Sequence, residues 1–169
     1  AHLCEDRKEM EGELAKLNLP SNFKLVITGA GRVAGGAIEV LKKTNIKRVS
    51  PEDFLNTAFD EPVYTQLDVE DYVKRDDGAF FDIPAFFSDP SGHSSNFMRY
   101  AAVADVYVAC HYWDNRSPFI FTREDVKSPN WNISLVADVS CDIDGPVATT
   151  LRPSTIADPF YGYNPQSEE

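Results

Sequence analysis

A glycine-containing turn between an expected strand and an expected helix constrains the fold of this chain most. The apolar run at residues 25–27 predicts a buried strand, and after the turn apolar residues recur at helical spacing. The turn reads Gly29-Ala30-Gly31-Arg32-Val33-Ala34 and has the spacing G-x-G-x-x-A. Gly29 permits a tight turn, Gly31 lets a pyrophosphate approach the backbone, and Ala34 lets the helix pack closely on the strand.

This motif predicts a bound dinucleotide, NAD or NADP, with residues 29–33 at its pyrophosphate, because a helix N-terminus directs free N–H groups at phosphates. The alternatives are a turn that binds S-adenosylmethionine and a turn that binds nothing. An acid about 20 residues past the first glycine normally bonds the ribose 2′-hydroxyl, and that position falls at Ser50. Either Glu52 or Asp53 reaches back, or Arg48 with Ser50 accommodates a 2′-phosphate, so the choice between NAD and NADP stays open. Ser50 is also expected to be the N-cap of a short helix, with Asp53 at N3.

The rest of the chain alternates apolar strands with helical segments, which predicts an α/β fold of Rossmann type. We expect a doubly wound, mainly parallel sheet of about six strands with helices on both faces. Residues 1–22 form a packing helix or connector, and residues 23–169 form the nucleotide-binding domain. The charged stretch 68–77 predicts a solvated surface, and 78–96 a long packed loop with one helical turn. Further strands are expected at 46–49, 62–67, 106–110 and 134–139, and helices at 95–104 and from Thr122.

The acidic composition excludes some classes of partner. The 169 residues carry a formal net charge of −11, whereas nucleic acids and anionic membranes need clustered Lys and Arg. No apolar run is long enough to span a bilayer, and no signal-peptide pattern opens the sequence. Three cysteines without a C-x-x-C spacing indicate free thiols in a reducing compartment, so we expect a cytoplasmic location. The three histidines lack metal-ligand spacing, and no metal site is predicted.

Ligands of doubly wound sheets bind beyond the carboxyl ends of the strands, and two further segments lie there. Cys110-His111-Tyr112 either supplies a platform for a base or ribose or closes the end of the sheet, and His111 could carry a proton. In Val139-Ser140-Cys141-Asp142, the carboxylate of Asp142 would lie near a nicotinamide and orient an amine or a water. Asp138 lies inside the strand and is expected to cap neighbouring N–H groups.

Three motifs in order resemble the family of lysine-ketoglutarate reductase and lysine-forming saccharopine dehydrogenase. They are Y-W-x-x-x-x-P at residues 112–118, D-[IV]-S-x-D at 138–142 and T-I-x-x-P-F at 155–160. The likeness extends over about residues 24–161. This family is related to alanine dehydrogenase and to the nucleotide-binding part of transhydrogenase.

The resemblance implies that the chain is the nucleotide-binding domain of a two-domain oxidoreductase. Such enzymes join an amino acid and a 2-oxo acid through an imine that takes a hydride from NAD(P)H, and their acid–base groups lie in the other domain. The resemblance places residues 29–33 at the pyrophosphate, 110–112 near the nucleotide, and Val139, Ser140 and Asp142 near the nicotinamide and substrate. Expected partners are the small-molecule substrate, the missing catalytic domain of the same polypeptide and, as one option, further copies in a homo-oligomer. The alternatives are an S-adenosylmethionine-binding methyltransferase domain and a non-catalytic ligand-sensing domain.

Overall fold

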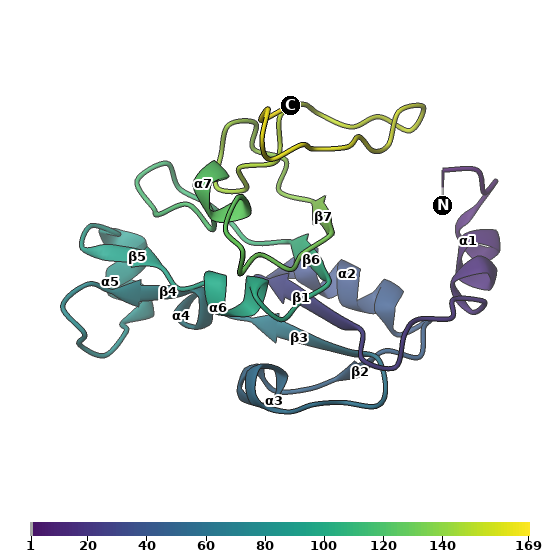
Figure 1. Cartoon of the computed structure of the whole chain (residues 1–169), viewed down its shortest axis with the longest axis horizontal. Coiled ribbons are helices and arrows are strands. Elements are labelled where there is room, and N and C mark those ends of the chain that lie inside the picture. The colour runs from purple at the N-terminus through teal and green to yellow at the C-terminus, as the bar shows by residue number, and fades with distance from the viewer. Residues whose placement is uncertain (1) are drawn as a thin grey trace.

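A five-stranded parallel sheet forms the centre of the computed structural model, which describes residues 2–169 (Figure 1). All four strand pairings are parallel, which confirms the predicted α/β fold of Rossmann type. The sheet has five strands where about six were expected, because the described chain beyond Asp142 is irregular and carries several prolines. The strand order is β2-β3-β1-β6-β7, with β1 (Lys24–Thr28), β2 (Lys47–Arg48), β3 (Val63–Leu67), β6 (Val106–Ala109) and β7 (Leu135–Asp138).

Helices cover both faces of the sheet, as predicted. The helix α2 (Arg32–Leu41) packs on one face, where the fully buried Ala34 meets Leu25 and Ile27 of the central strand. A larger core lies on the opposite face and includes Tyr100 and Tyr107. Since both faces of β1 are covered, its apolar run is continuous rather than alternating. The remaining α-helices on the larger core are α3 (Pro51–Asn56), α4 (Val69–Tyr72), α5 (Ile83–Ser88), α6 (Met98–Ala101) and α7 (Arg123–Val126).

The order of the strands places β3, not β2, beside β1. The chain passes from β1 to the sheet edge at β2 and then returns to β3, so β1 is flanked by β3 and β6. The chain therefore adds strands first on one side of β1 and then on the other. The carboxyl end of β1 is the switch point, where ligands of such sheets bind. Ser50, which follows the edge strand β2, is one strand farther from the glycine turn than the sequence suggested.

Residues 68–96 form a small folded unit. The expectation of a solvated surface at 68–77 is wrong, whereas the short helix expected within 78–96 is present as α5. The antiparallel pair of β4 (Val73–Arg75) and β5 (His93–Ser95) lies with α4 and α5 at the left of Figure 1. Tyr72 and Val73 are buried, although charged residues surround them in the sequence. The acidic side chains of α4 instead cap the helix, since Asp68 and Asp71 form a capping box. The helix expected at 95–104 is reduced to α6.

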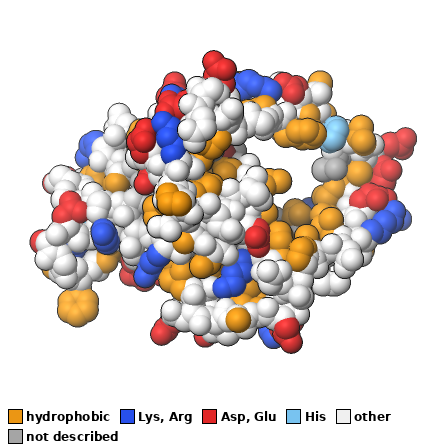
Figure 2. Space-filling model, viewed as in Figure 1, with side chains coloured by type: hydrophobic (Ala, Val, Ile, Leu, Met, Phe, Trp, Pro, Cys, Tyr) orange, Lys and Arg blue, Asp and Glu red, His pale blue; other side chains and the backbone are white. Residues whose placement is uncertain are grey.

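The N-terminal helix α1 (Arg7–Leu14) buries no residue and is held by charged contacts. Arg7 pairs with Glu39 of α2 at 2.6 Å, and His2 packs edge-on against Phe160 with ring centroids 6.0 Å apart. Figure 2 shows an opening through the molecule between this contact and the sheet.

No helix within residues 2–169 is both long enough and apolar enough to cross a membrane.

Candidate nucleotide-binding site

The glycine turn is tightly enclosed by the neighbouring strands. Gly29 has a φ of +102°, and a Cβ at this position would lie 2.5 Å from the carbonyl oxygen of Cys110. Its N–H donates to the Leu67 carbonyl at 2.9 Å, while Cys110 N–H donates to the Thr28 carbonyl at 3.0 Å. Only glycine fits this conformation and this space without strain. The turn is therefore fixed between the ends of β3 and β6.

The N-terminus of α2 faces open space. Gly31 is the N-cap with an extended backbone, and no atom lies within 4 Å of the position a Cβ would take. The N–H groups of Arg32 and Val33, both exposed, have no hydrogen-bond acceptor among the described residues. Arg32 also has no salt-bridge partner there. Free N–H groups, the positive end of a ten-residue helix and a guanidinium together favour an anion at this place.

An exposed carboxylate lies beside the turn at the end of β3. Asp68 follows Leu67 directly, and Gln66 of the same strand donates its amide to the Gly29 carbonyl at 3.0 Å. Asp68 also accepts the Val69 N–H at 2.7 Å. An acid was expected at a strand end near the glycine turn, and the spacing rule placed that position at Ser50. In the structure Asp68 lies at such a strand end, because β3 pairs with β1. The sequence could not show this, because an extra strand and helix separate Asp68 from the turn.

Ser50 is engaged as a helix cap. Its hydroxyl oxygen accepts the Asp53 N–H at 3.1 Å and its O–H donates to the Asp53 carboxylate at 2.7 Å. The predicted N-cap of α3 is confirmed. Nothing in this arrangement directs the Ser50 side chain at the glycine turn.

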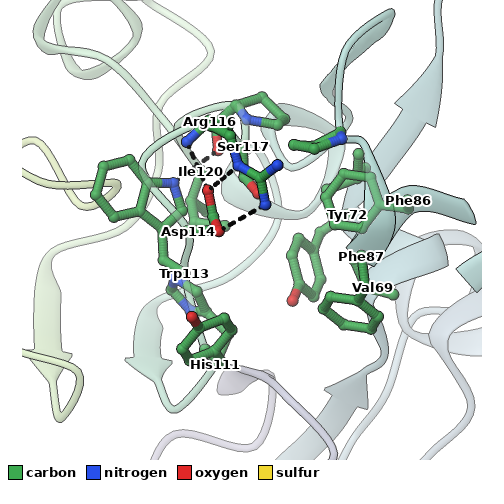
Figure 3. A pocket seen from close by; sticks show the side chains of 14 residues that line it. Val69, Tyr72, Phe86, Phe87, His111, Trp113, Asp114, Arg116, Ser117 and Ile120 are labelled. Carbon is green, nitrogen blue, oxygen red and sulfur yellow. Dashed lines mark hydrogen bonds and ion pairs between the residues drawn. The ribbon is translucent and has the colours of Figure 1, made fainter. Parts of the chain in front are cut away.

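A cavity of about 200 Å³ opens beyond the ends of β3 and β6, which flank the glycine turn (Figure 3). Its walls are mostly apolar and aromatic, from α4, from α5 and from the segment after β6. They include Val69, Tyr72, Phe86, Phe87, His111 and Trp113. A mostly apolar cavity beside the switch point of a parallel sheet suits an aromatic ring.

An ion pair closes the rim of this cavity. The guanidinium of Arg116 donates to both carboxylate oxygens of Asp114, at 2.9 and 3.0 Å, as the dashed lines in Figure 3 show. These hydrogen bonds lower the pKa of Asp114 to about 2. The charge of Arg116 is therefore matched by a neighbour within the same loop.

His111 is buried at the wall of the cavity, with 6% of its surface exposed. Its Nδ1 lies 2.8 Å from the Thr28 hydroxyl, which lies 2.8 Å from the Tyr107 hydroxyl. Nε2 has no hydrogen-bond partner in residues 2–169. Burial lowers the pKa of His111 to about 4, so the ring is neutral near pH 7 and poorly matched to carry protons there. His111 both closes the end of the sheet and lines the cavity, so both expected roles are compatible with its position.

The end of β7 is organised by Asp138. Its carboxylate accepts the Ser140 hydroxyl at 2.6 Å, the Cys141 N–H at 3.1 Å and the Thr150 hydroxyl at 2.6 Å, which confirms the predicted capping role. These bonds hold a turn in which Cys141 has a φ of 59°. Asp142 follows this turn and is exposed.

The other expected site residues lie along the same edge of the sheet. Val139 is half exposed, and its N–H donates to the Ala109 carbonyl at 2.9 Å, directly before Cys110. Cys110 is buried, and burial raises the pKa of its thiol, which argues against a nucleophilic role. Tyr112 is exposed. Because β1, β6 and β7 are adjacent and parallel, the segments after them meet at one edge.

A comparison with curated proteins identifies the relationship. The chain is 24% identical over 180 residues to alpha-aminoadipic semialdehyde synthase of Arabidopsis thaliana. The chain is therefore similar in sequence to a part of this plant synthase. The match covers 92% of this chain but 17% of the plant protein, so the chain spans about a sixth of that relative's length. No protein-family model matches the chain.

This similarity supports the resemblance to the lysine-ketoglutarate reductase and saccharopine dehydrogenase family that the sequence motifs indicated. The site adds two features that sequence reasoning missed, namely Asp68 and the cavity formed with residues 68–96. Among residues 2–169, no group of three or more His, Cys, Asp and Glu side chains is arranged to hold a metal ion.

Proposed function

We propose that this chain binds a nicotinamide dinucleotide, NAD in preference to NADP, as the nucleotide-binding domain of an amino-acid oxidoreductase of the saccharopine or alanine dehydrogenase type. One observation carries the proposal. The open N-terminus of α2, an exposed carboxylate and an aromatic cavity lie together around the switch point at β1. These are the three kinds of environment that a pyrophosphate, a ribose and an adenine require.

The pyrophosphate is assigned to residues 29–33. The unpaired N–H groups of Arg32 and Val33 can donate to phosphate oxygens, and the Arg32 guanidinium supplies a positive charge in a chain of net charge −11. The empty space around Gly31 fits a phosphate that approaches the backbone.

The adenosine ribose is assigned to Asp68 rather than to Ser50. A carboxylate beside the glycine turn accepts hydrogen bonds from ribose hydroxyls and repels a 2′-phosphate. This arrangement favours NAD over NADP. Arg48 is one strand farther out and donates to Gln66 at 3.0 Å.

The nicotinamide half is assigned to the end of β7, with Val139 and Ser140 on the nucleotide side and Asp142 toward the substrate. Cys110 and Tyr112 stay assigned to the nucleotide, and Tyr112 lines the cavity assigned to the adenine. Bound NAD supplies the hydride acceptor for oxidation at a C–N bond, and NADH the donor for the reverse reaction. The role of this chain is to hold the dinucleotide and to orient its nicotinamide ring. Asp138 fixes the turn that presents Val139 and Ser140. The substrate, an amino acid and a 2-oxo acid, needs acid–base groups from another domain of the polypeptide, so the chain alone binds nucleotide without turnover.

Calorimetric titration of the chain with NADH, NADPH and S-adenosylmethionine tests the proposal. We expect NADH to bind most tightly and Gly31→Val to abolish its binding. Gly12→Val is the matched control, because Gly12 also has open space around its Cβ position but lies in α1. Failure of NADH to bind, or equal binding by the Gly31→Val variant, would contradict the proposal. Preferential binding of S-adenosylmethionine would favour a methyltransferase domain.

A further inference from the structure

The ion pair at the rim of the aromatic cavity connects the two walls of that cavity. Asp114 and Arg116 lie in the segment after β6, and Nη1 of Arg116 donates across to the carbonyl of Ser88, the last residue of α5, at 3.4 Å. In the view of Figure 3 the pair lies between Trp113 and Tyr72. Both side chains line the cavity and stay accessible, with exposed fractions of 30% for Asp114 and 57% for Arg116. A ligand that fills the cavity therefore reaches these two side chains.

The Asp114 carboxylate keeps one acceptor position for a ligand. Its Oδ1 accepts two hydrogen bonds, from the backbone N–H and from Nε of Arg116, both at 2.9 Å. Its Oδ2 accepts one hydrogen bond among the described residues, from Nη2 of Arg116 at 3.0 Å. Each oxygen of an ionised carboxylate has two lone pairs, so Oδ2 can accept one further donor. The same hydrogen bonds hold the carboxylate in a fixed orientation before any ligand arrives.

The chemistry of adenine matches this acceptor. The apolar and aromatic walls can contact the faces of a flat ring, but the polar edge of the ring needs hydrogen-bond partners when it leaves water. The 6-amino group of adenine is a donor. Among the described residues that line the cavity, Asp114 is the one acid, and a hydrogen bond to an ionised carboxylate is stronger than one to a neutral acceptor.

We propose that Asp114 determines base specificity by accepting a hydrogen bond from the 6-amino group of the adenine at Oδ2, an inference that rests on the dinucleotide-binding function proposed above. Arg116 is a positioning residue, because its bonds to both carboxylate oxygens orient Oδ2. A base without the 6-amino group leaves Oδ2 without this donor. The rim of the cavity thereby distinguishes adenine from other flat rings that the apolar walls alone would accept.

Calorimetric titration of the chain with NADH and with its purine analogue tests this inference. In the purine analogue the 6-amino group of the adenine is replaced by hydrogen, and the rest of the dinucleotide is unchanged. We expect the analogue to bind about tenfold more weakly than NADH, as befits the loss of one hydrogen bond to a charged acceptor. Equal binding of the two dinucleotides would overturn the inference and leave the proposed function standing. Absence of NADH binding would overturn both.

Variants connect this tenfold ratio of affinities to Asp114 itself. In Asp114→Ala the ratio should fall to about one, because the acceptor is absent for NADH as well, and Arg116→Ala should reduce the ratio by releasing the carboxylate. Asp77→Ala is the matched control, since Asp77 accepts from Nε and Nη2 of Arg75 in the same way but does not line the cavity, and it should preserve the ratio.

A ratio that persists unchanged in a folded Asp114→Ala variant, with folding checked by circular dichroism, would overturn the inference. Asp114→Asn keeps the shape of the side chain and decides the matter if Asp114→Ala fails to fold. Its neutral amide is a weaker acceptor, so the ratio should fall below that of the unaltered chain, and an unchanged ratio would again contradict the role of Asp114.

Discussion

Acidification from pH 7.5 to pH 5 is expected to destabilise this chain through His111. Burial lowers the pKa of His111 to about 4, whereas an unfolded chain has a histidine pKa near 6.5. Between these two values the unfolded state binds a proton that the folded state does not. The free energy of unfolding therefore falls as the pH falls through this window, and His111 contributes fully to stability only above about pH 6.5.

The size of the effect follows from the two pKa values. Between pH 7.5 and pH 5 the linkage relation gives a loss of about 2 kcal/mol, out of about 3.4 kcal/mol once the pH is well below 4. His111 is 6% exposed, so solvent screening does not reduce this figure much. Asp77 and Asp114 have pKa values lowered by hydrogen bonds with Arg75 and Arg116, and their stabilising contributions are lost mainly below pH 4.

Urea denaturation at pH 7.5 and pH 5, followed by circular dichroism, measures the loss. The unaltered chain should lose about 2 kcal/mol more between the two conditions than a His111→Gln variant, at unchanged slope against urea. His2→Gln removes an exposed histidine and should behave like the unaltered chain. An equal loss in the unaltered chain and in His111→Gln would refute the assignment of a depressed pKa to His111.

Three further substitutions separate the fold from the site. Gly29→Ala should lower the free energy of unfolding by about 2 kcal/mol or more, because φ is +102° and the Cβ meets the Cys110 carbonyl; unchanged stability in urea would contradict the geometry of the turn. Asp68→Asn retains the cap of α4 but removes the charge, so NADH should bind about tenfold more weakly and NADPH relatively better; an unchanged ratio of the two affinities would exclude Asp68 from the ribose site. Ser50→Ala should cost about 1 kcal/mol of stability through the lost N-cap and leave the NADH affinity unchanged, which a thermal melt and a titration together check; weaker NADH binding without loss of stability would return the ribose role to Ser50.

The features that the sequence predicted are those that depend on neighbouring residues. The strand–turn–helix around Gly29 follows from local apolar spacing and from one small residue at Ala34. The caps at Ser50 and Thr122 follow from side chains that bond backbone groups three residues ahead. Each of these elements has the position that the sequence indicated.

The features that the sequence missed depend on contacts between distant segments. Which strand pairs with β1 is decided by burial across the whole sheet, so the chain order could not reveal that β3 lies beside the glycine turn. For this reason the spacing rule pointed to Ser50 and passed over Asp68. The small unit at 68–96 was missed because charged side chains flank Tyr72 and Val73 in the sequence, whereas both residues are buried in the larger core. The cavity arises from this unit and the segment after β6 together.

A crystal structure of the chain with bound NADH would locate each part of the nucleotide. We expect electron density for the pyrophosphate at the N–H groups of Arg32 and Val33, for a ribose beside Asp68, and for the adenine in the cavity lined by Tyr72 and His111. Density for the nucleotide at any other edge of the sheet, or an adenine outside this cavity, would contradict this expectation.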